Sequence, residues 1–207
     1  MIYRAVGNRC AVNFEDFNLS ISNYKAKKIL EDLGFKFLDK DLMLIAEELI
    51  KEKPQFKKLA LPSEAPSVVS CSTFTKWLYG QKGIWIPHRA IQQYLFGEEI
   101  EIDNTQTGDL IFISGWNSDY YHKDPHEKVG HVGIIKNRST IISASNRYGG
   151  LAEISLDEFM SWRIEKRALR GVRRYIPADV VTHTLLVPNQ FEVESSDDIG
   201  WIIRRNM

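Results

Sequence analysis

Two helical patterns open the part of the chain that has a clear period. Residues 1–22 show none, but from Asn23 apolar residues recur at the spacing of one helix face until Gly34, a residue that commonly ends helices. A second helix is expected to start after Asp39, which can serve as its N-cap, and to end before Pro54. These helices form either a small N-terminal subdomain or a pair packed on the main body.

A third helix is expected to begin at a cysteine. Residues 55–70, with Pro62 and Pro66, are predicted to form a loop, and the helix starts near Cys71. Its buried stripe is the set Phe74, Trp77 and Leu78, and its end is expected at Gly80 or Gly83. A short helical segment over residues 89–95 follows.

The pattern then changes to short strands. Strands are predicted over residues 110–114, 130–136 and 140–145, of which the last two form a hairpin, and over 171–176. Ser155 is a plausible cap for a short helix, and the tail, with the stretch "G-W-I-I-R-R", is expected to add a hairpin or edge elements. Helices before strands, without βαβ alternation, favour an α+β fold with helices packed on an antiparallel sheet. The domain expectation is an N-terminal helical extension (1–54), a main domain (55–178) and a C-terminal tail packing on it (179–207).

Composition and charge exclude several classes. The 207 residues are 43% hydrophobic and 26% charged with a net charge of zero, so the sequence predicts no basic field for nucleic acid. No apolar run approaches the ~20 residues of a membrane span. The first residues lack the apolar core of a signal peptide, so the chain is expected either to stay in the cytoplasm or to be exported with its signal removed. Two cysteines do not make a disulfide framework, and free thiols are expected.

Cys71 is the first candidate for chemistry. A helix N-terminus favours negative charge, which stabilises the reactive thiolate, and its N–H groups can hold an oxyanion. The alternative is that Cys71 is a structural residue, packed as a small buried side chain, which is the commonest role of a free cysteine.

His131 is the candidate general base, because a strand would hold its ring rigidly. A third polar group usually orients such a base. The neighbouring strand offers Ser143 and Ser145 on one face, followed by Asn146. The alternative for His131 is a purely structural histidine.

The loop between the first two strands is polar and aromatic. His122 and His126 could bind zinc only on a helix, which Pro125 between them disfavours, so no metal or other cofactor is expected. Trp116 and Tyr121 suit the wall of a substrate cleft, since aromatic rings stack on peptide and sugar faces. The basic stretch over residues 167–175 is expected to be a charged strand.

The stretches "V-S-C-S-T-F-T-K-W-L-Y-G", "T-G-D-L-I-F" and "G-H-V-G-I-I-K-N-R-S-T-I-I-S-A-S" resemble the NlpC/P60 cysteine peptidases over about residues 55–176. The resemblance implies a papain-like core and cleavage of bacterial cell-wall (peptidoglycan) peptides. It aligns Cys71 with the nucleophile, His131 with the base, and Ser143 with the third residue, which is usually a histidine in the family.

Three positions depart from the family pattern. Ser70 stands where an aspartate is common, Phe56 where a tyrosine is expected, and Ser143 where the third histidine lies, while Ser72 matches. The resulting hypothesis is a Cys–His endopeptidase for wall peptides, with Phe56, Ser70, Ser72, Trp116, Tyr121 and Asn146 lining the substrate site. The alternatives are a module that binds wall peptide without cutting it, and an amidase or acyltransferase on the same core.

Overall fold

The computed structural model describes residues 1–38, 40–114, 129–161 and 169–207, which divide into two compact units. Unit 1 combines Met1–Leu42, Tyr79–Trp85 and Asp179–Met207. Unit 2 combines Met43–Leu78 and Ile86–Ala178. In the described part of the chain, no helix is both long enough and apolar enough to cross a membrane.

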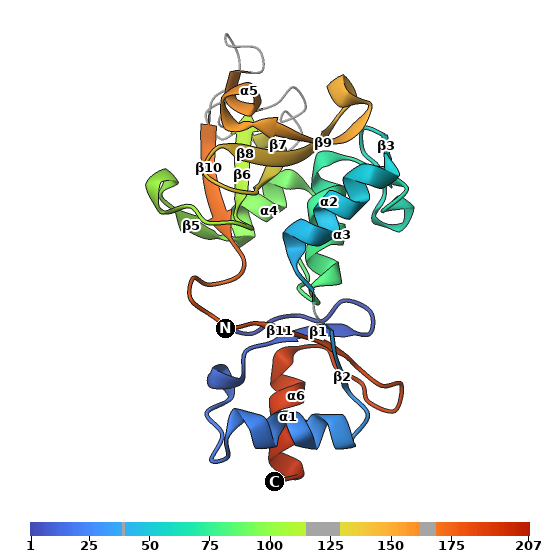
Figure 1. The fold of residues 1–207 in the computed structure, drawn as a ribbon, viewed down its shortest axis with the longest axis vertical. Helices are drawn as coiled ribbons and strands as arrows, with labels where there is room; N and C mark the ends of the chain where they lie inside the picture. Colours follow the sequence, from blue (N-terminus) through green and yellow to red (C-terminus); the bar gives the residue numbers. More distant parts are fainter. Residues whose placement is uncertain (39, 115–128, 162–168) are drawn as a thin grey trace. The chain divides into compact units, whose positions relative to one another are not determined.

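Unit 1 is a three-stranded antiparallel sheet with two helices, built from both ends of the chain (Figure 1). Its strand order is β1-β11-β2, and the helices α1 and α6 pack on each other and α6 packs on β1. The elements are β1 (Arg9–Val12), a 3₁₀ helix (Phe14–Phe17), α1 (Asn23–Asp32), β2 (Lys36–Leu38), β11 (His183–Leu186) and α6 (Ser196–Arg205). Its core includes Phe14, Phe17, Leu30, Leu185 and Ile199.

Unit 2 contains an eight-stranded sheet of order β4-β3-β9-β8-β7-β6-β10-β5. All neighbouring strands are antiparallel where their pairing is described, except β3 and β4, which are parallel. The helix α4 packs on β7 and β10, and α5 packs on β8 and β9 (Figure 1). The strands are β3 (Gln55–Phe56), β4 (Val68–Val69), β5 (Glu98–Ile100), β6 (Leu110–Ser114), β7 (Val129–Ile135), β8 (Thr140–Ser145), β9 (Gly150–Ser155) and β10 (Leu169–Arg174).

The helices of unit 2 are α2 (Leu42–Glu52), α3 (Cys71–Gln81, whose last turn belongs to unit 1), α4 (Ala90–Phe96) and α5 (Leu156–Ser161), with 3₁₀ turns at Pro62–Glu64, Ile102–Asn104 and Asn146–Tyr148. The α+β fold is confirmed. The predicted helix starts at Asn23 and Cys71 and the strands over 110–114 and 140–145 agree with the structure to the residue.

Two local expectations were wrong. The tail stretch "G-W-I-I-R-R" lies in α6 rather than in a hairpin, because its Ile202 and Ile203, with Ile199 just before it, are spaced to bury one helix face. Residues 55–70 are not all loop, since they include the two-residue strands β3 and β4 at one edge of the sheet.

Candidate functional site

Cys71 is the first residue of α3, and the helix start that carries it is tightly capped. The N–H of Thr73 donates to Ser70 Oγ (3.3 Å), and the N–H of Ser70 donates to Thr73 Oγ1 (2.6 Å). This reciprocal pair is a capping box in which threonine takes the place of the usual glutamate. Cys71 is partly exposed and not in a disulfide, as expected. The cap therefore fixes the backbone on both sides of the thiol.

The first turn of α3 is also held from α4. Gln93 is fully buried, and its side-chain N–H₂ donates to the carbonyl of Ser72 (3.0 Å) and to that of Pro87 (2.9 Å). The hydroxyl of Thr75 donates to Gln93 Oε1 (2.9 Å). Since α4 packs on β7, Gln93 links the helix that carries Cys71 to the layer that covers the histidine strand.

His131 lies on β7, is 7% exposed, and is in contact with Ser143 of β8. The distance from Ser143 Oγ to His131 Nε2 is 3.0 Å, and the Ser143 hydroxyl donates to the Val132 carbonyl at 2.9 Å. In the described residues, the backbone pairs between β7 and β8 are Ile134–Ile142 and Ile135–Ile141. Ser143 lies one residue beyond these pairs, and its side chain makes hydrogen bonds to β7 there.

This geometry determines the tautomer of the imidazole. A serine hydroxyl has one proton, and Ser143 directs it at the Val132 carbonyl, so its oxygen accepts from His131 Nε2–H. The neutral ring therefore carries its proton on Nε2, and its basic lone pair is on Nδ1. This is the form that a general base requires, with the orienting group on the nitrogen that does not exchange protons with substrate.

Phe159 of α5 lies against the same ring. The two ring centroids are 5.5 Å apart with 30° between the planes, and Phe159 is fully buried. Neither Phe159 nor Gln93 could be predicted as a site residue, because the sequence of a short helix does not show what a buried phenylalanine or glutamine contacts.

Four residues predicted to line the substrate site lie within the described part of the chain. Phe56 lies on β3 and pairs with Val69 of β4, two residues before Cys71. Ser72 follows Cys71 in α3 and is partly exposed. Asn146 is exposed and begins the turn after β8, and it is Ser143 that the structure places on the imidazole. Ser70 is 7% exposed with its hydroxyl in the helix cap, so its contact with substrate stays a prediction.

Trp116 and Tyr121 lie outside the described residues, as do His122 and His126. Within the described ranges, no group of three or more histidine, cysteine or acidic side chains could hold a metal ion.

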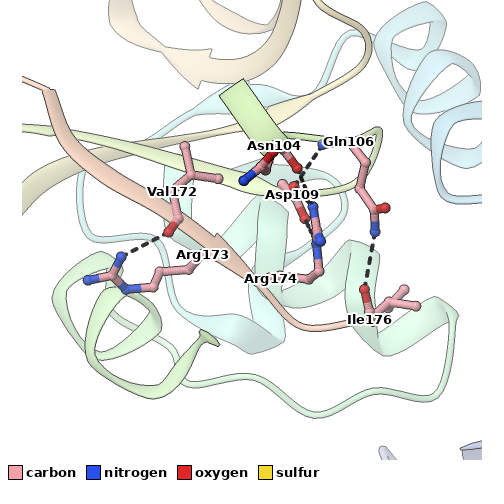
Figure 2. Close-up of polar contacts among 7 residues, drawn as sticks. All are labelled: Asn104, Gln106, Asp109, Val172, Arg173, Arg174 and Ile176. Atoms are coloured by element: carbon pink, nitrogen blue, oxygen red, sulfur yellow. Dashed lines mark hydrogen bonds and ion pairs between the residues drawn. The ribbon is translucent and has the colours of Figure 1, made fainter. Parts of the chain in front are cut away.

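A buried ion pair holds the sheet next to the histidine strand (Figure 2). Arg174 of β10 donates through Nε to Asp109 Oδ1 (2.9 Å) and through Nη2 to Oδ2 (2.7 Å), and the N–H of Gln106 also donates to Oδ2 (2.8 Å). Asp109 precedes β6, which pairs with β7 on one side and β10 on the other. The aspartate of "T-G-D-L-I-F" thus has a structural partner.

The neighbouring Arg173 is likewise satisfied within the chain. It donates to the carbonyls of Tyr94 (2.7 Å) and Val172 (2.8 Å), and its guanidinium lies 3.8 Å from the centroid of the Tyr94 ring. Of the basic stretch, Leu169–Arg174 form a strand, as expected, and the charges of Arg173 and Arg174 are bound within the chain.

A thiol at a helix start and an imidazole on a strand, carried by an α+β scaffold, are the components of the papain-like class of thiol hydrolases. The model of the NlpC/P60 family matches residues 60–170, which is more than half of the 207-residue chain. The chain therefore belongs to the NlpC/P60 family.

This chain spans less than half the length of two of its relatives. A protein of Corynebacterium glutamicum named probable endopeptidase is 33% identical over 93 residues, which is 44% of this chain and 38% of that protein. The solved structure of NlpC1 from Trichomonas vaginalis is 22% identical with a TM-score of 0.48, over 63% of this chain and 42% of that chain. RipD from Mycobacterium tuberculosis, described as a non-catalytic peptidoglycan-binding NlpC/p60 protein, is 11% identical with a TM-score of 0.44, over 67% of this chain and all of that chain.

Proposed function

We propose that the chain is a cysteine endopeptidase that hydrolyses an amide bond in peptidoglycan peptides. The observation that supports it most is the set of hydrogen bonds from Val132 O through Ser143 to His131 Nε2, which leaves Nδ1 as the base. Cys71 at a capped helix start supplies the nucleophile. The family assignment and the probable endopeptidase among the relatives support the reaction class.

The proposed reaction has two halves. His131 Nδ1 takes the proton of the Cys71 thiol, and the resulting thiolate attacks the amide carbonyl carbon, forming a C–S bond, while the helix N-terminus stabilises the oxyanion. The tetrahedral intermediate collapses as the C–N bond breaks, and Nδ1 gives this proton to the leaving amine. In the second half, Nδ1 takes a proton from water as the water oxygen attacks the thioester carbon. The C–S bond then breaks, the carboxylic acid is released, and Nδ1 returns its proton to the Cys71 sulfur. This scheme requires no cofactor.

The alternative within the same family is a module that binds wall peptide without cutting it. It is favoured by the same substitutions that depart from the family pattern: Phe56 has no hydroxyl, and the hydroxyl of Ser70 is used in the helix cap. An amidase or acyltransferase on this core is the third candidate.

The test is a digest of purified muropeptides followed by mass spectrometry. Wild type should release peptide fragments, and Cys71→Ala should release none. The matched control is Cys10→Ala, because Cys10 is the other cysteine, is fully buried in unit 1, and should be dispensable for cleavage. Binding of muropeptide without cleavage by wild type would establish the binding module. Modified but uncut wall peptide, or cleavage of an amide elsewhere, would establish the transferase or amidase.

Iodoacetamide labelling gives an independent readout of the thiol. Burial raises the pKa of the Cys10 thiol to about 12, with a further contribution from Asp198, so Cys10 should stay unlabelled in the folded chain. Cys71 should label rapidly, and its rate should fall in His131→Ala if the imidazole stabilises the thiolate. An unchanged rate in His131→Ala would show that the two groups do not act together.

A further inference from the structure

The imidazole of His131 contacts two groups from different elements. Ser143 of β8 accepts from Nε2–H, and the Phe159 ring of α5 has its centroid 5.5 Å from that of the imidazole, with 30° between the planes. A hydrogen bond fixes one nitrogen but leaves the ring able to rotate about that bond. A flat apolar surface close to one ring face removes much of this freedom.

The backbone of β7 is built to admit the Phe159 ring. Gly133 is two residues from His131 and so shares its face of the strand. A Cβ on Gly133 would lie 3.0 Å from Phe159 Cε2 and 2.4 Å from Ile141 Cγ2, which is closer than packed carbon atoms approach. The glycine two residues after His131 in "H-V-G-I" therefore leaves the space that Ile141 and Phe159 fill.

The helix that carries Phe159 is anchored at its start. Ser155 Oγ accepts from the N–H of Glu158 (3.0 Å), which caps α5. The Tyr148 hydroxyl donates to Glu158 Oε1, and Arg147 also lies 3.4 Å from that carboxylate oxygen. The turn that follows β8 is thereby tied to α5, so Ser143 and Phe159 are held by connected elements.

We propose that Phe159 is a positioning residue for the general base, and that Phe159 and Ser143 together confine the His131 ring to the orientation in which Nδ1 receives the proton. This inference rests on the proposed function, because it assigns His131 the role of base. It adds a residue of α5 to the machinery, and predicts that the aromatic surface acts on the turnover step and not on substrate affinity.

The test compares Phe159→Leu with Leu156→Ala. Phe159→Leu keeps an apolar side chain but removes the flat ring, while Leu156 is on the same helix and packs on the same cluster of buried residues. Phe159→Leu should lower kcat by up to about 100-fold with KM within about twofold, since misplacement of a catalytic group by about 1 Å has an effect of that size. Leu156→Ala should lower stability but leave kcat within about threefold of wild type.

A second measurement does not depend on turnover. NMR relaxation of the His131 ring Cε1–H bond should give a high order parameter in wild type and a lower one in Phe159→Leu, because loss of the flat ring lets the imidazole rotate. The ¹⁵N shifts should show protonation at Nε2 in both neutral rings, because Ser143 selects the tautomer. A wild-type order parameter and wild-type kcat in Phe159→Leu, or equal loss of kcat in Leu156→Ala, would overturn the inference. If wild type cuts no peptide, the proposed function fails, and the order parameters still decide whether Phe159 positions the ring.

Discussion

Ser143→Ala removes a hydroxyl that connects the candidate base to the neighbouring strand. In the folded chain this oxygen lies 3.0 Å from His131 Nε2 and 2.9 Å from the Val132 carbonyl, and Ser143 is 1% exposed. The substitution leaves a buried N–H and a buried carbonyl without this partner. Each such group costs about 1–3 kcal/mol, so the free energy of unfolding should fall by at least that amount.

The effect on turnover follows from the charge of the ring. When Nδ1 is protonated the imidazolium donates to Ser143, and a hydrogen bond to a charged group contributes about 1.5–3 kcal/mol. Because about 1.36 kcal/mol corresponds to a factor of ten in rate, kcat should fall roughly 10- to 150-fold. Ser143→Thr, which keeps the hydroxyl and suits a strand, should recover most of the rate.

The matched control is Ser145→Ala on the same face of β8. Ser145 is 3% exposed, and among the described residues its Oγ has no hydrogen-bond partner. Its removal should leave kcat within about twofold of wild type. The assay is the muropeptide digest with kcat and KM measured separately, alongside urea unfolding. Equal losses in Ser143→Ala and Ser145→Ala, or a wild-type rate in Ser143→Ala, would refute the reasoning about the tautomer.

Three further predictions concern stability. Asp109→Ala leaves the buried Arg174 guanidinium without its counter-ion, so unfolding in urea should show a loss of about 3–5 kcal/mol, and a loss under about 1 kcal/mol would contradict the role given to the pair. Burial, and then the nearby Lys27 charge, lower the pKa of His183, so its neutral form is favoured in the fold and stability should fall as the pH drops below about 6.5. Thermal melts at pH 7.5 and 5.0 should show a smaller difference in His183→Gln than in wild type, and an identical difference would exclude this histidine as the cause. Ser70→Ala removes the α3 cap and should cost about 1 kcal/mol by urea unfolding, whereas no measurable change would mean that Thr73 alone holds the helix start.

Much of the fold could be predicted because apolar runs in the sequence coincide with the strands that are buried in the structure. The strand Leu110–Ser114 is an apolar run after a turn, and Thr140–Ser145 follows another turn, so both ends are marked in the sequence. The composition of unit 1 could not be predicted, because β1 and β11 lie at opposite ends of the chain and pair only in the folded protein. Such long-range pairing leaves no local signal.

The candidate site divides in the same way. Cys71 could be found because it begins a helix and His131 because it lies on a strongly apolar strand, and Ser143 because it is twelve residues from His131 on the adjacent strand. The contacts of Phe159 and Gln93 depend on how α5 and α4 pack, which a single sequence does not determine. The pairing of Asp109 with Arg174, which are 65 residues apart, is of the same kind.

A serine as third residue changes how the base must be held. A hydroxyl carries no net charge and has a short reach, so it selects the Nε2–H tautomer and accepts a hydrogen bond from the imidazolium, but adds no opposite charge beside it. The Ser143 hydroxyl donates its own proton to the Val132 carbonyl, and this hydrogen bond fixes the direction of the lone pairs on the Ser143 oxygen. Orientation must then come mainly from contact, and the ring of Phe159 beside Gly133 provides a rigid surface for it. On this account the opposite charge that balances the imidazolium is the proposed Cys71 thiolate, and a serine hydroxyl does not titrate in the working range, so the pH dependence of turnover should follow that of Cys71 alkylation.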